Sequence, residues 1–450
     1  MPGTKSSQGV YRLDTRRTIM KFCFATLGCK VNQFETQALA QLAQARGHTL
    51  AQSGADVCIL NTCTVTSSGD HKTLRALHKM QRDNPDAVVA LCGCFAQTEP
   101  ERAAQLDGVD IVCGTADRAA VLTLCEQAVQ NRKKICTVSD IRQKRTFEAL
   151  PAGVLPGHTR ALLKIQDGCD NYCTYCIIPY ARGHVRSLPL AQAVEQAQRL
   201  AQNGVREIVV TGIEIASYGR DLPDQPDLTA LTAALCRTVP QVRIRLGSLE
   251  PRMVTQEFCD TLCGFPNLAL HFHLSLQSGC DATLKRMHRR YTTAQYLACV
   301  ENLRKAFPSS SITTDVITGF PGETEQEFAQ TKQFLCRCGF AAVHVFPYSE
   351  RAGTPAASMP DSVPQTVRAQ RADELRTLAF GLTSDFLRDF VGKTVPAVLE
   401  HARADCQPAH SRWHFAIELP LGCGNQGDEI DVVLTEVCGN SMRAIPAKKD

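Results

Sequence analysis

The chain has 450 residues, more than one ordinary hydrophobic core uses, so we expect two or three domains. Hydrophobic residues make up 44% and charged residues 21%, and the net charge of +4 permits a nucleic-acid partner without requiring one. The 22 cysteines do not indicate a secreted disulfide protein, because the first 20 residues are polar and basic. No stretch approaches the ~18 apolar residues of a membrane span. We therefore expect a cytoplasmic protein with reduced thiols and no membrane partner.

Short apolar runs alternate with helical stretches in the first third of the chain. The runs "KFCFATLG", "ADVCILNTC", "AVVALCGC" and "DIVCGTA" are typical of strands, and "NQFETQALAQLAQARG" and "HKTLRALHKMQRD" of helices. This alternation predicts an α/β fold with a doubly wound parallel sheet. We place this N-terminal domain at residues 20–145, after an N-terminal extension of residues 1–19. Residues 131–160 are basic and then rich in Pro and Gly, which indicates a linker.

A second alternating series follows, with six expected strands in "RALLKIQDGC", "EIVVTGIEI", "RIRLGSLE", "LALHFHLSLQSG", "SITTDVITGF" and "AAVHVFPYS". Helical stretches between them predict a partial (β/α)6 TIM barrel over residues 146–388, with the chemistry at the carboxyl ends of its strands. The segment 389–450 contains strand-like runs with little helix, which predicts a small all-β barrel.

A cysteine motif directly follows the first strand of this second series. The segment "GCDNYCTYCIIPYARG", residues 168–183, contains Cys169, Cys173 and Cys176. Three thiolates at this spacing can hold three corners of a 4Fe–4S cluster and leave the fourth iron open to an external ligand. A zinc site that lacks one ligand, or chance spacing in a cysteine-rich chain, is the alternative.

The motif, with Tyr175 before its last cysteine, resembles the radical S-adenosylmethionine (SAM) superfamily. In that superfamily SAM chelates the open iron and is cleaved to a 5′-deoxyadenosyl radical. Later strands contribute matching segments: "TGIEI" with Gly212 and Glu214, "HLSLQSG" with Gln277, and "DVITGFPGET" with Gly319. The resemblance implies that these residues and Tyr175 bind SAM. Glu214, in the segment that contains Gly212, would bind its amino group, and Gln277 its ribose or carboxylate. The glycines of "DVITGFPGET", Gly319 among them, would let the backbone approach the adenine.

Three further cysteines each follow a predicted strand of the N-terminal domain: Cys29, Cys63 and Cys94. Parallel strands present their carboxyl ends at one edge of the sheet, so these thiols can converge on a second cluster with one open iron. The alternative is that they are ordinary buried thiols. Burial is what we expect of three cysteines inside the same strands, Cys23, Cys58 and Cys92.

The segments "TLGCKVNQFET", "NTCTVT" and "GCFAQ", followed by the three-cysteine loop, resemble the methylthiotransferase family over about residues 20–450. The resemblance implies an N-terminal cluster domain, a radical SAM barrel and a C-terminal TRAM module. It also implies two 4Fe–4S clusters and SAM as cofactors. An auxiliary cluster would be held by Cys29, Cys63 and Cys94, and the SAM cluster by Cys169, Cys173 and Cys176.

Three segments resemble the type within this family that acts on threonylcarbamoyl-adenosine in tRNA: residues 243–251, 273–292 and 344–356. The implied reaction adds a methylthio group to C2 of N6-threonylcarbamoyladenosine at position 37, in the anticodon loop, and uses two SAM. It requires an electron donor such as flavodoxin or ferredoxin, and a sulfur source. The alternatives are isopentenyl-adenosine in tRNA, an aspartate of a ribosomal protein, or a non-enzymatic iron–sulfur protein for electron transfer or RNA binding.

Four arginines are candidates for contact with tRNA phosphates: Arg182, Arg186, Arg289 and Arg290. Ordinary solvated or ion-paired arginines are the alternative. Two features depart from the family. Leu188 stands where the family commonly has a further arginine. The TRAM-like residues 392–450 contain six Lys/Arg against eight Asp/Glu, a balance that disfavours phosphate binding and leaves a structural or docking role.

Overall fold

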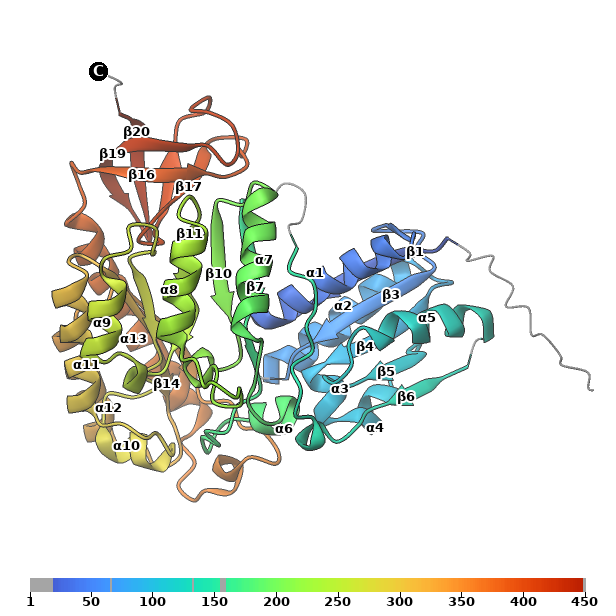
Figure 1. Cartoon of the computed structure of the whole chain (residues 1–450). Helices are drawn as coiled ribbons and strands as arrows, with labels where there is room; N and C mark the ends of the chain where they lie inside the picture. The colour runs from blue at the N-terminus through green and yellow to red at the C-terminus, as the bar shows by residue number, and fades with distance from the viewer. Residues whose placement is uncertain (1–18, 65–66, 132, 154–158, 448–450) are drawn as a thin grey trace, which may run out of the picture.

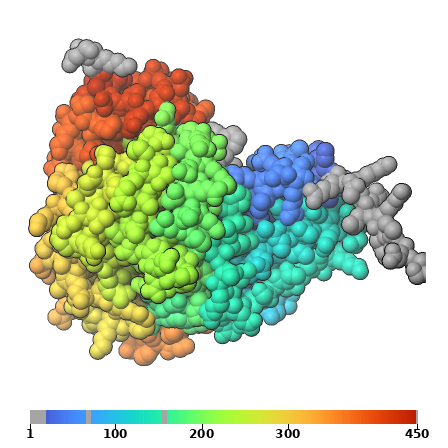
Figure 2. Space-filling model, viewed as in Figure 1, coloured from blue at the N-terminus to red at the C-terminus, as the bar shows by residue number. Residues whose placement is uncertain are grey.

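The computed structural model describes residues 19–64, 67–131, 133–153 and 159–447, and these form the expected α/β architecture (Figure 1). The extension expected at residues 1–19 lies outside the described residues except for Ile19. In Figure 2 the N-terminal domain, in blue and cyan, packs against one side of the central domain. The C-terminal barrel, in red, packs on another side of the central domain. No helix in the described ranges is long and apolar enough to cross a membrane.

The N-terminal domain contains a six-stranded parallel sheet in the order β2-β1-β3-β4-β5-β6. Its strands are β1 (Lys21–Thr26), β2 (Thr49–Leu50), β3 (Val57–Thr62), β4 (Val88–Gly93), β5 (Ile111–Cys113) and β6 (Ile135–Thr137). Its helices are α1 (Lys30–Ala45), α2 (Ser67–Asp83), α3 (Cys94–Thr98), α4 (Pro100–Ala104) and α5 (Ala120–Asn131).

Alternate residues of β3 enter hydrophobic clusters on opposite faces of this sheet. Val57 and Ile59 pack in one cluster, and Cys58 and Leu60 pack in the other. A strand buried on both faces carries a continuous apolar run, which is why β3 and β4 were recognisable in the sequence. Strand β6 lies inside the stretch predicted to be a linker, so the sheet extends further than the sequence indicated.

The central domain is an open barrel built from two parallel sheets. The first contains β7 (Arg160–Lys164), β10 (Glu207–Thr211) and β11 (Arg243–Leu246); the second contains β12 (Ser248–Leu249), β13 (His271–Leu274), β14 (Ser311–Thr318) and β15 (Ala342–Pro347). A short antiparallel pair, β8 (Gln166–Asp167) and β9 (Arg186–Ser187), lies beside them. All six strands expected in this region are present.

Helices separate these strands, as the sequence predicts. They are α6 (Ile178–Arg182), α7 (Leu190–Gln202), α8 (Leu228–Thr238), α9 (Gln256–Leu262), α10 (Asp281–Arg286), α11 (Thr293–Ala306), α12 (Glu325–Cys338) and α13 (Gln365–Arg388). Phe272 and Leu274 of β13 pack in the large core beneath the helices. Because strand side chains alternate, His271 and His273 point the other way, into the barrel interior.

The C-terminal segment forms a closed barrel with strand order β16-β17-β18-β20-β19. Its strands are β16 (Thr394–Leu399), β17 (Gln407–Ser411), β18 (Ala416–Leu419), β19 (Glu429–Cys438) and β20 (Ser441–Pro446). Strand β17, "QPAHS", was not expected, because its sequence is polar and contains a proline.

The C-terminal barrel lies over the amino ends of β7, β10 and β11 (Figure 1). Two acidic residues of the C-terminal domain pair with arginines there. Glu400 lies 3.2 Å from Arg160 of β7, and Glu429 lies 2.7 Å from Arg243 of β11. The acidic charge that disfavours RNA binding therefore contributes to docking the barrel on the central domain.

Candidate active site

Cys29, Cys63 and Cys94 all follow carboxyl ends of neighbouring parallel strands, and the structure brings them together. Cys29 is the N-cap of α1 after β1, Cys63 follows β3, and Cys94 begins α3 after β4. Gly28 has φ of +114°, and a Cβ there would lie 2.7 Å from the Cβ of Cys63, so the turn that brings Cys29 close requires glycine. The Cys94 thiol interacts electrostatically with both other thiols.

Cys169, Cys173 and Cys176 form a second group in the loop between β8 and α6. Burial raises the pKa of Cys176 to about 12 and that of Cys94 in the first group to about 11. A buried thiolate is unfavourable without a compensating cation, and metal binding supplies one. Three soft thiolate donors at each place therefore fit an iron–sulfur cluster with one iron open to another ligand.

One arginine contacts a sulfur in each cysteine group. Nε of Arg182 donates a hydrogen bond to Sγ of Cys94 at 3.2 Å, and Nη1 of Arg289 donates one to Sγ of Cys173 at 3.4 Å. Hydrogen bonds to sulfur are a standard means by which proteins raise the reduction potential of a cluster. Neither contact was predicted, because Arg182 and Cys94, and likewise Arg289 and Cys173, are far apart in sequence and no local pattern indicates that they meet.

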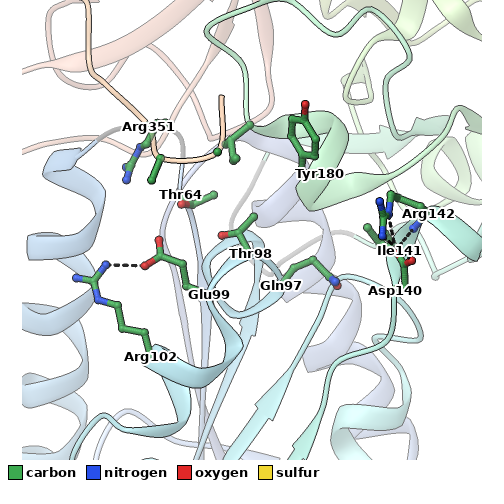
Figure 3. A pocket seen from close by; sticks show the side chains of 13 residues that line it. Thr64, Gln97, Thr98, Glu99, Arg102, Asp140, Ile141, Arg142, Tyr180 and Arg351 are labelled. Carbon is green, nitrogen blue, oxygen red and sulfur yellow. Dashed lines mark hydrogen bonds and ion pairs between the residues drawn. The ribbon is translucent and has the colours of Figure 1, made fainter. Parts of the chain in front are cut away.

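The two cysteine groups lie close to each other. The Cys176 thiol interacts electrostatically with that of Cys94, although the two residues belong to different domains. A cavity of about 650 Å³ is lined by the direct neighbours of one cysteine from each group, Thr64 after Cys63 and Ile177 after Cys176, and by Gln97 and Tyr180. Figure 3 shows these side chains arranged around the cavity, together with the ion pairs Arg102–Glu99 and Arg142–Asp140.

A buried carboxylate joins the two domains. Glu35 of α1 accepts from Arg182 at 2.5 Å, Lys164 at 2.8 Å and Arg118 at 2.9 Å. Burial alone would raise the pKa of Glu35, but these cations outweigh it and lower the pKa to about 2. Asp167 is buried in the same network, 2.7 Å from Nζ of Lys164. None of these roles was predicted from the sequence.

Tyr175 and Gln277, two of the five residues expected to bind SAM, line a cavity of about 280 Å³ beside Cys176. Glu214 is close by and interacts electrostatically with Cys169. Its buried Oε1 has no hydrogen-bond partner among the residues described, and burial raises the pKa of this carboxyl. An acceptor that is buried and unsatisfied fits the amino group of SAM.

The two glycines expected near SAM are placed differently. A Cβ on Gly212 would lie 2.9 Å from Oε1 of Gln166, the atom that accepts a hydrogen bond from the backbone N–H of Glu214. Gly212 therefore lets the Glu214 loop close. Gly319 has φ of +67° and packs against Arg368, so its need for glycine comes from the backbone and from α13 rather than from the cavity.

The structure changes the set of arginines available to RNA. Arg182 and Arg186 are buried in the Glu35–Asp167 network, and a buried, ion-paired guanidinium cannot reach a phosphate. Arg289 is occupied by Cys173 and Tyr291. Arg290 is exposed.

Leu188 is fully buried in the central core, which explains why a leucine suits that position here.

We expect anaerobic reconstitution of the full chain to load about eight iron atoms, four at each cysteine group. Cys63→Ser and Cys173→Ser should each reduce this to about four, measured by iron and sulfide analysis of the desalted protein. Cys113→Ser, a substitution of a buried thiol in β5, is the matched control and should keep the full complement. Full loading of both ligand variants would contradict this assignment.

Two family models match the chain. Residues 163–335 match the Radical SAM superfamily, and residues 21–114 match the Uncharacterized protein family UPF0004. The chain is 41% identical over 381 residues to the Threonylcarbamoyladenosine tRNA methylthiotransferase MtaB of Bacillus subtilis, with 84% of each chain covered. It is 36% identical to the protein of that name from Aquifex aeolicus, covering 84% of this chain and 93% of the relative.

A relative of another type matches somewhat less well. The tRNA-2-methylthio-N(6)-dimethylallyladenosine synthase of Syntrophotalea carbinolica is 32% identical, with 84% of this chain and 88% of the relative covered. Among solved structures, the radical S-adenosylmethionine methyltransferase TsrM from Kitasatospora setae superimposes with a TM-score of 0.56 at 14% identity, covering 76% of this chain and 74% of that one. This last likeness concerns the fold alone.

Proposed function

We propose a substrate and a set of site residues for this chain, which belongs to the radical SAM methylthiotransferase family of tRNA-modifying enzymes. The proposed substrate is N6-threonylcarbamoyladenosine at position 37 of tRNA, and the proposed product carries a methylthio group at C2 of its adenine. The named relatives of that type are 35–41% identical to this chain, and those named for dimethylallyladenosine are 32–33% identical.

The observation that supports this proposal best is the approach of two three-cysteine groups from different domains. We assign Cys29, Cys63 and Cys94 to an auxiliary 4Fe–4S cluster, and the loop cysteines to the SAM cluster. When bound, these groups supply the methylthio sulfur and a radical able to remove hydrogen from an aromatic carbon. Two such sites close together suit a reaction in which one position loses hydrogen and gains sulfur.

The chain's own residues bind and orient the reactants. Tyr175 and Gln277 are assigned to SAM because they line the cavity beside Cys176. Glu214 is assigned to SAM because it interacts with Cys169 and has an unsatisfied buried acceptor. The larger cavity, whose wall includes Arg102, Arg142 and Arg351, is assigned to the anticodon loop (Figure 3). The wall also contains Glu99 and Asp140, which pair with Arg102 and Arg142, so its charged side chains keep a positive excess of one. A positive excess suits phosphates, and a base turned out of the loop would reach both cysteine groups from there.

The proposal also includes a cytoplasmic location, a low-potential electron donor such as flavodoxin or ferredoxin, and a separate sulfur source. Each turnover replaces a C2–H bond by a C2–S bond. The hydrogen would end in 5′-deoxyadenosine, and methionine would be the other product of that SAM, whose cleavage takes one electron from the donor. The electron released when the sulfur joins C2 would pass to the iron–sulfur groups held by the two cysteine sets. A second SAM supplies the methyl group.

Nucleoside mass spectrometry tests the substrate. Total tRNA from a strain lacking this protein is expected to accumulate threonylcarbamoyladenosine and to lack its 2-methylthio form, and the wild-type gene should restore that form. The isopentenyl nucleoside serves as the internal comparison, since its methylthio form should not change. Loss of the methylthio isopentenyl form instead would transfer the assignment to the other tRNA substrate.

A further inference from the structure

Three polar side chains meet inside the central barrel, apart from the residues assigned to SAM and the clusters. His273, Asp315 and His344 come from adjacent strands β13, β14 and β15, and Asp315 pairs with His344 in register. Their side-chain nitrogen and oxygen atoms lie within 4.8 Å of one another. Nε2 of His273 is 3.2 Å from Oδ2 of Asp315, and its Nδ1 is 2.9 Å from Oγ1 of Thr313, so the imidazole is held in place from both sides.

This trio lies next to the SAM-side cavity. Asp315 lines that cavity together with Cys176 and Gln277. The backbone N–H of Gln277 donates to the carbonyl of Asp315 at 2.8 Å, which fixes the two residues together. The larger cavity, assigned to the anticodon loop, shares Ile177 with the SAM-side cavity. A group that extends from a base at this junction into the barrel would therefore meet Asp315 and then the two histidines.

Lys30 adds a positive charge that acts on the same interior from a solvent-exposed side chain. It directly follows Cys29 at the start of α1. Its ammonium interacts electrostatically with the barrel residues His271, His344, Arg245 and Glu207. In the part of the chain that the structure describes, its side chain makes no hydrogen bond or ion pair. Other cations of the barrel are already paired: Arg245 with Glu207, Arg160 with Glu400, and Lys164 with Glu35.

We propose that this interior is the subsite for the threonylcarbamoyl substituent, with the Lys30 ammonium binding its carboxylate and the His273–Asp315–His344 trio binding its hydroxyl and carbamoyl groups. The inference rests on the proposed function and names the residues that would select this substrate. An isopentenyl group would displace water from this interior without offering a partner to the Lys30 ammonium or to the Asp315 carboxylate. A site whose polar groups bind the substrate strongly rejects an analogue that lacks the matching polar group. An apolar site rejects an analogue with an extra polar group much more weakly.

A pair of substrates isolates the charge on which this proposal depends. One is an anticodon stem-loop RNA with threonylcarbamoyladenosine, and the other is the same RNA with the threonyl carboxylate as its methyl ester. The reconstituted full-length enzyme is expected to prefer the acid by on the order of 100-fold in kcat/KM. In Lys30→Met this preference should fall to roughly threefold or less through loss of activity on the acid, and Lys30→Arg should keep most of it.

The second variant is His344→Ala. Because His344 lies far in sequence from the cluster cysteines, its replacement should leave cluster loading unchanged. It is expected to lower kcat/KM for both RNAs by roughly tenfold, because acid and ester share the hydroxyl and carbamoyl groups. His401→Ala, an exposed histidine of the C-terminal domain, is the matched control and should behave as wild type. Iron content and the melting temperature are measured for every variant, so that a misfolded protein is recognised.

Three results would overturn the inference. The first is an equal loss on acid and ester in Lys30→Met with the iron content intact. The second is an unchanged kcat/KM in His344→Ala. The third is one equivalent of a non-iron metal in wild type that disappears in His344→Ala, because the trio would then be a metal site. If the wild type cleaves SAM but methylthiolates neither RNA, the proposed function itself fails. That outcome is distinguishable from the three results above, which contradict only the subsite.

Discussion

Replacing Cys29 with alanine is expected to abolish methylthio transfer while reductive cleavage of SAM persists. Cys29 belongs to the N-terminal thiol group, whereas the loop cysteines belong to another domain with its own cavity. Each group holds three ligands, so removing one thiol should disable one site and leave the other loaded. The measurements are 5′-deoxyadenosine formed after reduction and the methylthio nucleoside in substrate RNA. We expect near wild-type deoxyadenosine and a methylthio product below detection.

Two matched variants make this result interpretable. Cys23→Ala removes a buried thiol from the strand that leads to Cys29 and should retain both activities, apart from a modest loss of stability. Cys173→Ala removes a loop ligand and should lose both activities. Loss of deoxyadenosine formation in Cys29→Ala, with four irons still bound, would show that the two sites do not act separately.

Replacing Glu35 with glutamine is expected to lower the free energy of unfolding by about 3–5 kcal/mol, because three buried cations lose their shared carboxylate. The geometry supports a large effect, since Glu35 is fully buried and its partners come from both domains. The measurement is chemical denaturation followed by intrinsic fluorescence and by circular dichroism. Glu195→Gln, which breaks the exposed pair with Arg199 on α7, is the control and should cost less than about 1 kcal/mol.

The pH dependence of the Glu35 effect follows from its lowered pKa. The folded-state pKa of about 2 lies below the ordinary value of 4.5, so the native carboxylate holds fewer protons than the unfolded one between these values. Its stabilisation is complete above about pH 4.5 and is lost as the pH falls towards about 2. The stability difference between wild type and Glu35→Gln should therefore shrink over this range. A difference that stays constant down to pH 3 would contradict the assignment of the charge to Glu35.

Most of the fold could be predicted because its strands are buried on both faces or alternate clearly with helices. The strands that were not predicted lack a local signal for one of two reasons. Strands β2 and β6 contain two and three residues, which is too short for a periodic pattern. Strand β17 is polar and contains Pro408, and it forms only because the neighbouring strands of a closed barrel supply its hydrogen bonds. Local sequence does not carry that information.

Some features of the candidate site could likewise be predicted from the sequence, and others could not. The approach of Cys29, Cys63 and Cys94 could be predicted, since parallel strands align their carboxyl ends. The place of Arg182 could not, because an arginine in a loop after a cysteine motif has the same local signal whether it is solvated or buried. Its burial depends on Glu35, more than a hundred residues earlier in the chain. Pairings over such distances are decided by how the domains dock.

The position of the C-terminal barrel has a consequence for the depth of the site. It covers the amino ends of the central strands, where the rings of His271 and His414 lie 4.8 Å apart and Glu400 and Glu429 secure the contact. The interior of the central barrel is thus closed at the amino ends of its strands, and the residues that close it belong to the C-terminal domain. A substituent that enters past the SAM-side cavity has a fixed depth available. Under the proposal above, the C-terminal domain would set the greatest length of substituent that the barrel accepts.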